Sequence, residues 1–440
     1  MRTTRFTHNR RKRRDMGVRL WSVSFLLLLL ASILSGQEVR EANSWMSSSE
    51  LPPSSIENST MLTPVAPLVP PAPNHLSQNI DETAPGKPPV DEDASRQVLL
   101  AFVGDILLGE QVGRLLVRNG FDYPYTYVSS ILQRADIAAG NLETAVIAQQ
   151  PKPGLKTFEF QSDPAALPAL AEAGMDIVNL ANNHSMDFGE EGLRETMEHL
   201  DQAGIRHVGA GENITAAYDS VSLMSGDIRV AFLGLTRVIP SVTWRAGEDK
   251  LGVAETYNLE KPLQAIAAAS EEADLVVVLV HWGIEGEQQP DPVKQVELAH
   301  RYIDAGADLV IGSHPHVLQG FEYYKDRWIA YSMGNFIFTK SSNPLTYETG
   351  ILEATCTQSG ECQLRLLPYW VNTPQPEPMS PEQAQILFAR LSDLSVGASV
   401  NSEGDIVPNV PNKSLNNSST HTMMGETTNT IDGGGANDGQ

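Results

Sequence analysis

Histidines follow three apolar stretches of this sequence, each at the point where the stretch ends. Residues 173–184, 273–281 and 306–316 all pass from a predicted helix end through Asp and a β-branched run to a histidine, and the third supplies the pair His314 and His316. Ligands of α/β sheets bind at the carboxyl ends of the strands, so we expect these imidazoles to converge on one crevice. Imidazole is the commonest metal ligand among side chains, and the pattern therefore favours a metal site.

Oxygen ligands follow two further predicted strands. Asp105 ends the apolar run 98–105, and Asn141 and Glu143 end the short run 136–143. Carboxylate and amide oxygens complete sites for Mn, Fe or Zn. A single histidine after a strand is more often a hydrogen-bonded loop residue, but four of them with two carboxylates favour a metal centre.

The amino terminus combines a basic segment with an apolar run, as membrane-directed segments do. The first 19 residues carry eight Lys or Arg and one acid, and residues 20–36 are almost wholly apolar. This segment is either a secretory signal or a single anchor, and we favour an uncleaved anchor because residues 34–36 match a cleavage site poorly. Its 17 residues are short for a span of about 20. Either alternative keeps the amino terminus in the cytoplasm and sends the rest of the chain across a bacterial cell membrane, or releases it if the signal is cleaved.

The remaining chain is strongly acidic. With the first 19 residues set aside, it holds 23 bases and 53 acids, a net charge of −30. Such a surface repels nucleic acid and anionic lipid, so we expect no nucleic-acid partner. A polyanionic substrate would have to be held locally, by metal or by Arg and Lys in the cleft.

The two cysteines, Cys356 and Cys362, flank a predicted turn. Residues 351–355 and 363–367 have the pattern of a β-hairpin, which a disulfide would clamp. A disulfide fits an oxidising compartment, and two free thiols are the alternative.

Composition divides the chain into four parts. Residues 1–36 are the basic segment with its anchor or signal, and 37–96 are a Pro- and Ser-rich linker that we expect to be disordered. Residues 97–372 alternate predicted strands and helices, which is typical of an α/β domain. Residues 373–440 are expected to hold a peripheral helix at 380–394 and a disordered tail from 397.

Six motifs give this sequence a resemblance to a known family. It resembles the CapA family of poly-γ-glutamate capsule biosynthesis proteins, within the calcineurin-like metallophosphoesterase superfamily, over residues 98–371. The motifs occur in the family's order at residues 104–105, 140–143, 181–189, 281–283, 312–316 and 331–336. The resemblance implies a four-layer αββα sandwich, with an antiparallel hairpin near the carboxyl end of the domain.

The resemblance also implies roles for the motif residues. Two divalent ions, of Mn, Fe or Zn, would be held by Asp105, Asn183, His281, His314 and His316. His184 matches a histidine that is not a ligand but stabilises charge or protonates the leaving group, and Asp187 matches the carboxylate that orients it.

Two departures from the superfamily pattern concern the metals. Leu107 stands where related phosphoesterases have a histidine, and Asn141 stands where they have a bridging Asp. Asn141 and Glu143 complete the predicted metal-ligand set, with Glu143 as the candidate for the missing anionic ligand.

Three functions follow from these observations. The first is a membrane-anchored, metal-dependent hydrolase of capsule biosynthesis, which acts on an anionic polymer or a phosphoester. The second is a non-catalytic accessory that binds the polymer or tethers capsule-synthase subunits. The third is a generic secreted metallophosphoesterase. Leu107 and Asn141 favour the accessory, whereas His184 with Asp187 favours the enzyme.

Overall fold

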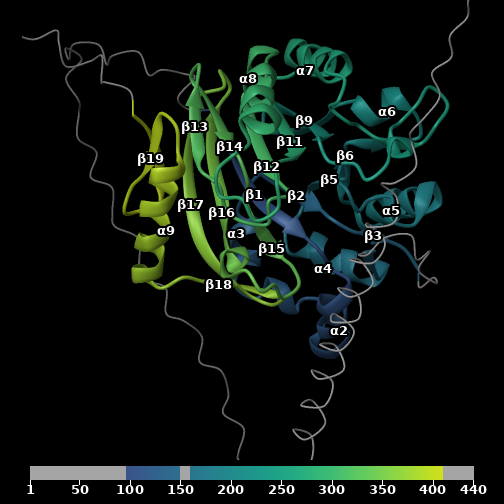
Figure 1. The fold of residues 1–440 in the computed structure, drawn as a ribbon, viewed down its shortest axis with the longest axis horizontal. Helices are drawn as coiled ribbons and strands as arrows, with labels where there is room; N and C mark the ends of the chain where they lie inside the picture. Colours follow the sequence, from purple (N-terminus) through teal and green to yellow (C-terminus); the bar gives the residue numbers. More distant parts are fainter. Residues whose placement is uncertain (1–95, 149–158, 410–440) are drawn as a thin grey trace, which may run out of the picture. The chain divides into compact units, whose positions relative to one another are not determined.

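The computed structural model describes residues 96–148 and 159–409 (Figure 1). The predicted anchor at 20–36, nearly all of the predicted linker and the last 31 residues lie outside these ranges. Within the described ranges, no helix is both long and apolar enough to cross a membrane.

Two large β-sheets build the domain. The first follows the order β19-β20-β17-β16-β1-β2-β5-β6, with β15 beside β1 and β18 beside β17. Its strands are β1 (Gln97–Ile106), β2 (Ile137–Leu142), β5 (Ile177–Asn179), β6 (Arg206–Val208), β15 (Asn335–Ile337), β16 (Glu348–Thr357), β17 (Cys362–Asn372), β18 (Gln375–Pro378), β19 (Ala398–Val400) and β20 (Asp405–Pro408). The second sheet follows the order β13-β14-β12-β11-β9-β8. Its strands are β8 (Val221–Ser225), β9 (Ile228–Thr236), β11 (Leu275–His281), β12 (Leu309–Ser313), β13 (Phe321–Tyr324) and β14 (Arg327–Ala330).

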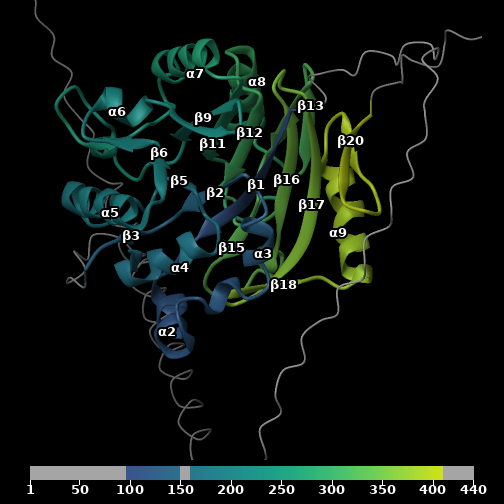
Figure 2. The same ribbon diagram turned by 180° about the vertical axis from the view of Figure 1, so that it is seen from behind.

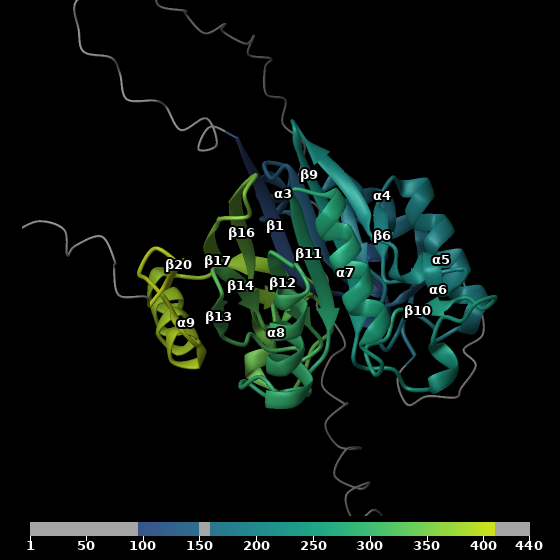
Figure 3. The ribbon, with the colours of Figure 1, turned by 90° about the horizontal axis from the view of Figure 1, so that it is seen from above.

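Helices cover the outer face of each sheet, as Figure 3 shows from above. They are α2 (Glu110–Asn119), α3 (Ser129–Leu132), α4 (Leu167–Glu172), α5 (Gly189–Ala203), α6 (Ile214–Tyr218), α7 (Glu260–Glu272) and α8 (Glu297–Asp304). Helix α9 (Pro381–Leu394) packs instead against the apolar cluster between the sheets. Helices α2 to α5 share a buried apolar cluster with one face of the first sheet, and α6 to α8 share another with the second sheet.

A third apolar cluster lies between the two sheets. Phe102 of β1, Phe232 of β9 and Leu279 of β11 are fully or almost fully buried in it. The inner faces of both sheets are therefore buried against each other. The order of layers is helix, sheet, sheet, helix. The α/β class is confirmed.

Parallel strands bring the predicted ligands to one edge of the molecule. In the first sheet, Asp105 of β1 pairs with Asn141 of β2. In the second, His281 of β11 pairs with Ser313 of β12. Because both pairs lie where their strands end, the two sheets present their polar residues at the same edge.

Residues 328–336 belong to two strands in two different sheets. β14 ends at Ala330 in the second sheet, and β15 begins at Asn335 beside β1 in the first. The chain crosses between the sheets through Gly334, whose φ is +63° and whose carbonyl accepts a hydrogen bond from Asp105 N at 2.9 Å. A Cβ atom at Gly104 would overlap that carbonyl, so the crossing requires glycine there.

The hairpin near the carboxyl end of the domain consists of β16 and β17, which pair antiparallel (Figure 2). Cys356 and Cys362 face each other at its turn and form a disulfide.

The chain after this hairpin is more ordered than its composition suggests. Helix α9 begins with a capping box between Ser380 and Gln383, and its Leu387 and Leu391 enter the core between the sheets. The prediction of a disordered tail from residue 397 is wrong for β19 and β20, because β20 pairs with β17 and extends the first sheet. Ala398, Val400 and Ile406 of this segment are buried, whereas Val407 is exposed.

Candidate metal centre

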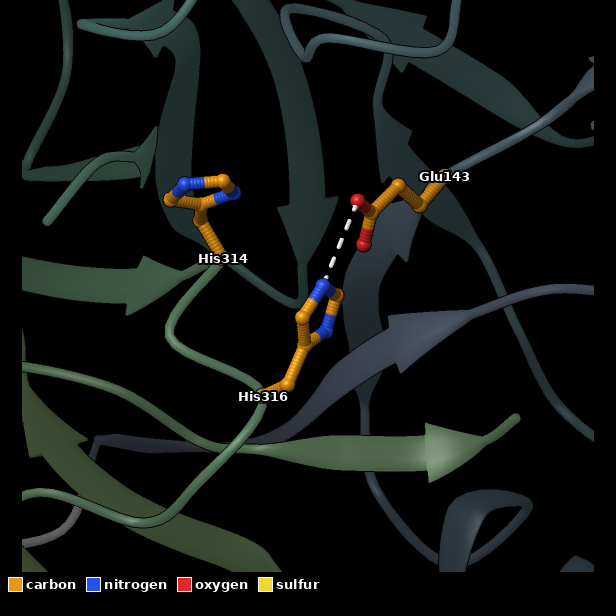
Figure 4. A group of neighbouring side chains, drawn as sticks. All are labelled: Glu143, His314 and His316. Carbon is orange, nitrogen blue, oxygen red and sulfur yellow. Dashed lines mark ion pairs between the residues drawn. The ribbon is translucent and has the colours of Figure 1, made fainter. Parts of the chain in front are cut away.

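A carboxylate without a hydrogen-bond donor lies at the middle of the site. Glu143 is 0% exposed, and neither of its oxygens has a hydrogen-bond partner among the described residues. Its Oε1 lies 3.8 Å from His281 Nε2, 3.9 Å from His316 Nε2 and 4.0 Å from His184 Nε2. Figure 4 shows His316 pointing at this oxygen. These distances are too long for hydrogen bonds and close to twice the length of about 2.0–2.1 Å that joins a metal to nitrogen or oxygen.

Two groups of potential ligands share Glu143. The ligand atoms of Glu143, His314 and His316 lie within 4.8 Å of one another, and so do those of Asp105, Glu143 and His281. A buried anion without a donor is costly unless a cation accompanies it. The donor set of imidazoles and carboxylates thus fits one or two divalent ions around Glu143.

Hydrogen bonds at the far side of two imidazoles orient them. Asn335 Oδ1 lies 2.9 Å from Nδ1 of His316, and Ser313 Oγ lies 3.0 Å from Nδ1 of His281. The contact at His316 leaves its Nε2 directed at Glu143, and that at His281 leaves its Nε2 between Glu143 Oε1 and Asn183 Oδ1. Metal-ligating histidines usually have such a partner on the other ring nitrogen, which fixes the tautomer. The sequence reasoning gave no role to Ser313 or Asn335, although both lie inside motifs of the resemblance.

The two predicted amide ligands differ in their surroundings. Asn183 Oδ1 lies 2.6 Å from His281 Nε2, within the ligand cluster. Asn141 instead donates from Nδ2 to Asp105 Oδ1 at 2.8 Å, while its Oδ1 accepts from Asn179 and Asn182 at 3.2 and 3.3 Å. Both oxygen and nitrogen of Asn141 are therefore engaged, and because its Nδ2 also lies 3.2 Å from His281 Nδ1, Asn141 contacts two of the predicted ligands, Asp105 and His281.

His184 lies on a loop rather than at a strand end. Strand β5 ends at Asn179, and the chain then turns through a loop that Asn182 holds by accepting a hydrogen bond from His184 N at 3.0 Å. His184 Nδ1 lies 2.7 Å from Asp187 Oδ2, so its Nε2 faces Glu143. Asp187 and His184 thus have the geometry of an oriented proton donor.

Aromatic rings cover the two outer imidazoles. Phe160 stacks on His184 with ring centroids 4.0 Å apart, and Phe338 lies 4.8 Å from His316. The backbone N of Phe160 donates to Asp187 Oδ2 at 2.8 Å, which ties this wall to the proton donor. No periodic pattern marks either Phe as a site residue, so sequence reasoning missed both.

The backbone at the histidine pair is strained. His314 has a φ of +95° and His316 a φ of +58°. Residues other than glycine seldom adopt these values, and such strain is concentrated at functional sites.

Burial and charge divide the histidines into two kinds. Burial, with the neighbouring imidazoles, lowers the pKa of His281 well below its usual range and that of His314 to about 3. Burial alone would also lower the pKa of His316, but the charge of Glu143 and the charge and hydrogen bond of Asp105 raise it to about 10. Burial and the charge of Asp105 raise the pKa of Glu143.

These pKa shifts predict that metal binding releases a proton. Without metal, His316 is protonated at neutral pH, and its Nε2 must be neutral to bind a cation. We expect release of about one proton per site and an affinity that falls about ten-fold per pH unit between about pH 9 and pH 6. Calorimetry in buffers of different ionisation enthalpy measures the release. A wild-type affinity independent of pH over this interval would contradict the shift assigned to His316.

The fold and this cluster define an α/β sandwich protein with a candidate metal centre at the strand ends. The family model described as bacterial capsule synthesis protein PGA_cap matches residues 99–340. The chain belongs to this family.

Curated relatives carry related names. The chain is 32% identical over 317 residues to a capsule biosynthesis protein CapA of Bacillus anthracis, covering 70% of this chain and 77% of that one. It is 31% identical over 281 residues to a PGA biosynthesis protein CapA of Bacillus subtilis, covering 63% and 73%. Among solved structures, it is similar to a calcineurin-like phosphoesterase YfkN of Bacillus subtilis, at 17% identity and a TM-score of 0.34, over 59% of this chain and 85% of that one.

Proposed function

We propose that this member of the capsule synthesis family is a membrane-anchored, extracytoplasmic hydrolase whose centre holds divalent metal ions. The observation that carries the proposal is Glu143, a buried carboxylate that faces three imidazoles and has no hydrogen-bond donor among the described residues. Family membership supports a role in poly-γ-glutamate capsule biosynthesis.

The proposed location rests on sequence and on one covalent bond. The basic first 19 residues and the apolar segment 20–36 favour a single anchor with the amino terminus inside the cell. The disulfide between Cys356 and Cys362 supports an oxidising compartment for the domain.

The proposed roles follow the geometry. The metal would be held by imidazole and oxygen ligands, namely Asp105, Glu143, Asn183, His281, His314 and His316. A divalent ion there supplies a Lewis acid and an activated water. His184 would donate the proton from Nε2 to the leaving group, while Asp187 holds the ring through Nδ1 and Phe160 excludes water from its face.

Metal content and turnover test this proposal together. The full-length protein, loaded with Mn²⁺, is assayed on a chromogenic phosphodiester and on γ-glutamyl polymer, with His281→Ala as the inactive variant. Hydrolysis of the polymer in preference to the diester supports a capsule role, and the reverse preference indicates a generic phosphoesterase. A purified protein that binds no divalent metal would overturn the proposal.

A non-catalytic accessory is the second candidate, and two residues favour it. Asn141 supplies no bridging carboxylate between the two ligand groups, and Leu107 is fully buried apolar packing where related phosphoesterases have a histidine. A protein with this centre could bind polymer, or tether synthase subunits, without turnover.

An Asn141→Asp variant separates these two candidates. A carboxylate at this position supplies the anionic bridge, so an accessory with a defective second metal site should gain metal and turnover. A hydrolase that already works with Glu143 should instead keep its metal and lose about ten-fold or more in turnover, because the introduced carboxylate cannot donate the hydrogen bond that Asn141 Nδ2 gives to Asp105 Oδ1. Metal stoichiometry and turnover, measured on the same sample, give the answer.

A further inference from the structure

A loop without helix or strand lies against the histidine pair. It consists of residues 283–291, shortly after β11. The backbone N of Gly286 in this loop donates a hydrogen bond to Pro315 O at 2.8 Å. Because Pro315 stands between His314 and His316, the loop contacts the strained segment directly.

Two buried glutamines hold the loop in place. Gln319 Nε2 donates to the carbonyls of Glu287 and Gln289, at 2.9 and 3.3 Å. Gln319 Oε1 accepts from Gln295 Nε2 at 2.7 Å, and Gln295 Oε1 accepts from Asp291 N at 2.9 Å. The pair of glutamines, which we name the glutamine clamp, therefore bonds the loop at three of its residues.

The glutamine clamp has one orientation. Gln295 Nε2 donates a second hydrogen bond to Tyr331 O at 3.3 Å, so both amide nitrogens and both amide oxygens are engaged. The side chains are 0% and 1% exposed, and turning either amide over would set oxygen against oxygen at a site that water does not reach. Gly283 lies on the clamp at a φ of +88°, where a Cβ atom would come 2.7 Å from Gln295 Oε1.

The strained backbone at the histidine pair needs such support. A residue other than glycine keeps a positive φ only where its surroundings hold it there. Pro315 has no N–H, so its carbonyl is its one backbone group for hydrogen bonding, and Gly286 N is the donor to it. The position of Gly286 in turn depends on a loop that has no strand or helix of its own to fix it.

We propose that Gln319 and Gln295 are positioning residues of the candidate metal centre, which hold loop 283–291 on Pro315 and thereby set the spacing of the histidine pair. The hydrogen bonds of both side chains end on backbone groups or on each other. Neither glutamine is therefore a ligand in this proposal, and both act through the backbone of the loop. The proposal rests on the proposed function for the metal, but the clamp itself can be tested without one.

Gln319→Leu in the full-length protein tests the proposal, because it removes the donor to the loop and the acceptor for Gln295. In the metal-free protein, the backbone amides of residues 283–291 should exchange hydrogen at least about ten-fold faster, as measured by mass spectrometry. Mn²⁺ affinity should fall about 10–100-fold, as for other residues that orient metal ligands. The visible absorption of the Co²⁺-loaded protein, which reports coordination geometry, should differ from that of the wild type.

Gln375→Leu is the matched control. Gln375 is also buried, and its Nε2 donates to Tyr123 O at 2.8 Å and to Thr126 Oγ1 at 3.1 Å, outside the ligand cluster. Its replacement should lower the urea midpoint by a comparable amount and leave loop exchange, Mn²⁺ affinity and the Co²⁺ spectrum unchanged. Equal losses of Mn²⁺ affinity in the two variants would reduce the effect of Gln319 to general stability and overturn the proposal.

A double variant shows whether the effect passes through the histidine pair. In a His316→Ala background, the loss of Mn²⁺ affinity caused by Gln319→Leu should be several-fold smaller, because one of the two positioned ligands is gone. An equal loss in both backgrounds, or loop exchange that is unchanged in Gln319→Leu, would overturn the proposal. Metal content and turnover of the wild type report on the proposed function alone, whereas loop exchange in chelator reports on the clamp alone.

Discussion

Glu143→Gln is expected to abolish metal binding without destabilising the metal-free protein. Glu143 belongs to both groups of potential ligands. Replacing a residue that only hydrogen-bonds to a metal ligand weakens metal affinity about 10–100-fold, and we expect a larger loss when Glu143 itself is replaced. In the metal-free protein, loss of the attraction between Glu143 and protonated His316 is offset by removal of a buried carboxylate that has no donor, so a neutral amide of the same shape should change the free energy of unfolding by less than about 1 kcal/mol. Metal titration and urea unfolding in a chelator measure the two effects.

Glu322→Gln is the matched control for this variant. Glu322 is also a buried carboxylate, but it accepts hydrogen bonds from Tyr331 Oη and from His300 Nε2. Its replacement should cost about 1–3 kcal/mol of stability and leave metal affinity unchanged. If Glu143→Gln destabilised the metal-free protein as much as Glu322→Gln does, Glu143 would be a structural residue and the metal centre would lose its main support.

His184→Asn is expected to remove most of the turnover while leaving the metal in place. A positioned general acid contributes about 10²–10⁴-fold to the rate, and the loss should be larger for an amine or alkoxide leaving group than for nitrophenolate, which needs no proton. Asp187→Asn should give a smaller loss with the same dependence on the leaving group, because Asp187 acts through the orientation of His184. Steady-state rates with the two kinds of leaving group measure the difference.

His199→Asn serves as the control for His184. His199 lies on α5 and contacts Glu195, outside the ligand cluster, so its replacement should leave rates and metal content unchanged. Equal losses for both leaving groups in His184→Asn would argue against proton donation, and a parallel loss of metal would make His184 a ligand.

The strand-end residues of the site could be predicted because one rule governs them. Asp105 and His281 end parallel strands with continuous apolar runs, and Glu143, His314 and His316 follow directly after such strands. A buried strand is readable from its β-branched run, and its carboxyl end is where polar residues of a sheet gather. The sequence thus predicts both the edge of the sandwich and these residues on it.

The supporting residues could not be predicted in the same way, because tertiary packing places them. Asn335 reaches His316 only because the chain crosses from one sheet to the other between β14 and β15, and no periodicity reports a change of sheet. Phe160 depends on the two-stranded sheet of β3 (Ala145–Val146) and β4 (Gln161–Ser162), which is too short to read from sequence. Strands β19 and β20 were missed because their three buried apolar residues, Ala398, Val400 and Ile406, pack where only the folded sheet provides an edge.

The central claim is that Glu143 and the surrounding imidazoles hold a cation, and anomalous diffraction from crystals soaked in Mn²⁺ tests it most directly. The account predicts one or two anomalous peaks about 2.0–2.4 Å from a Glu143 oxygen and from Nε2 of His281 or His316. Crystals that show no peak at Glu143 would contradict it.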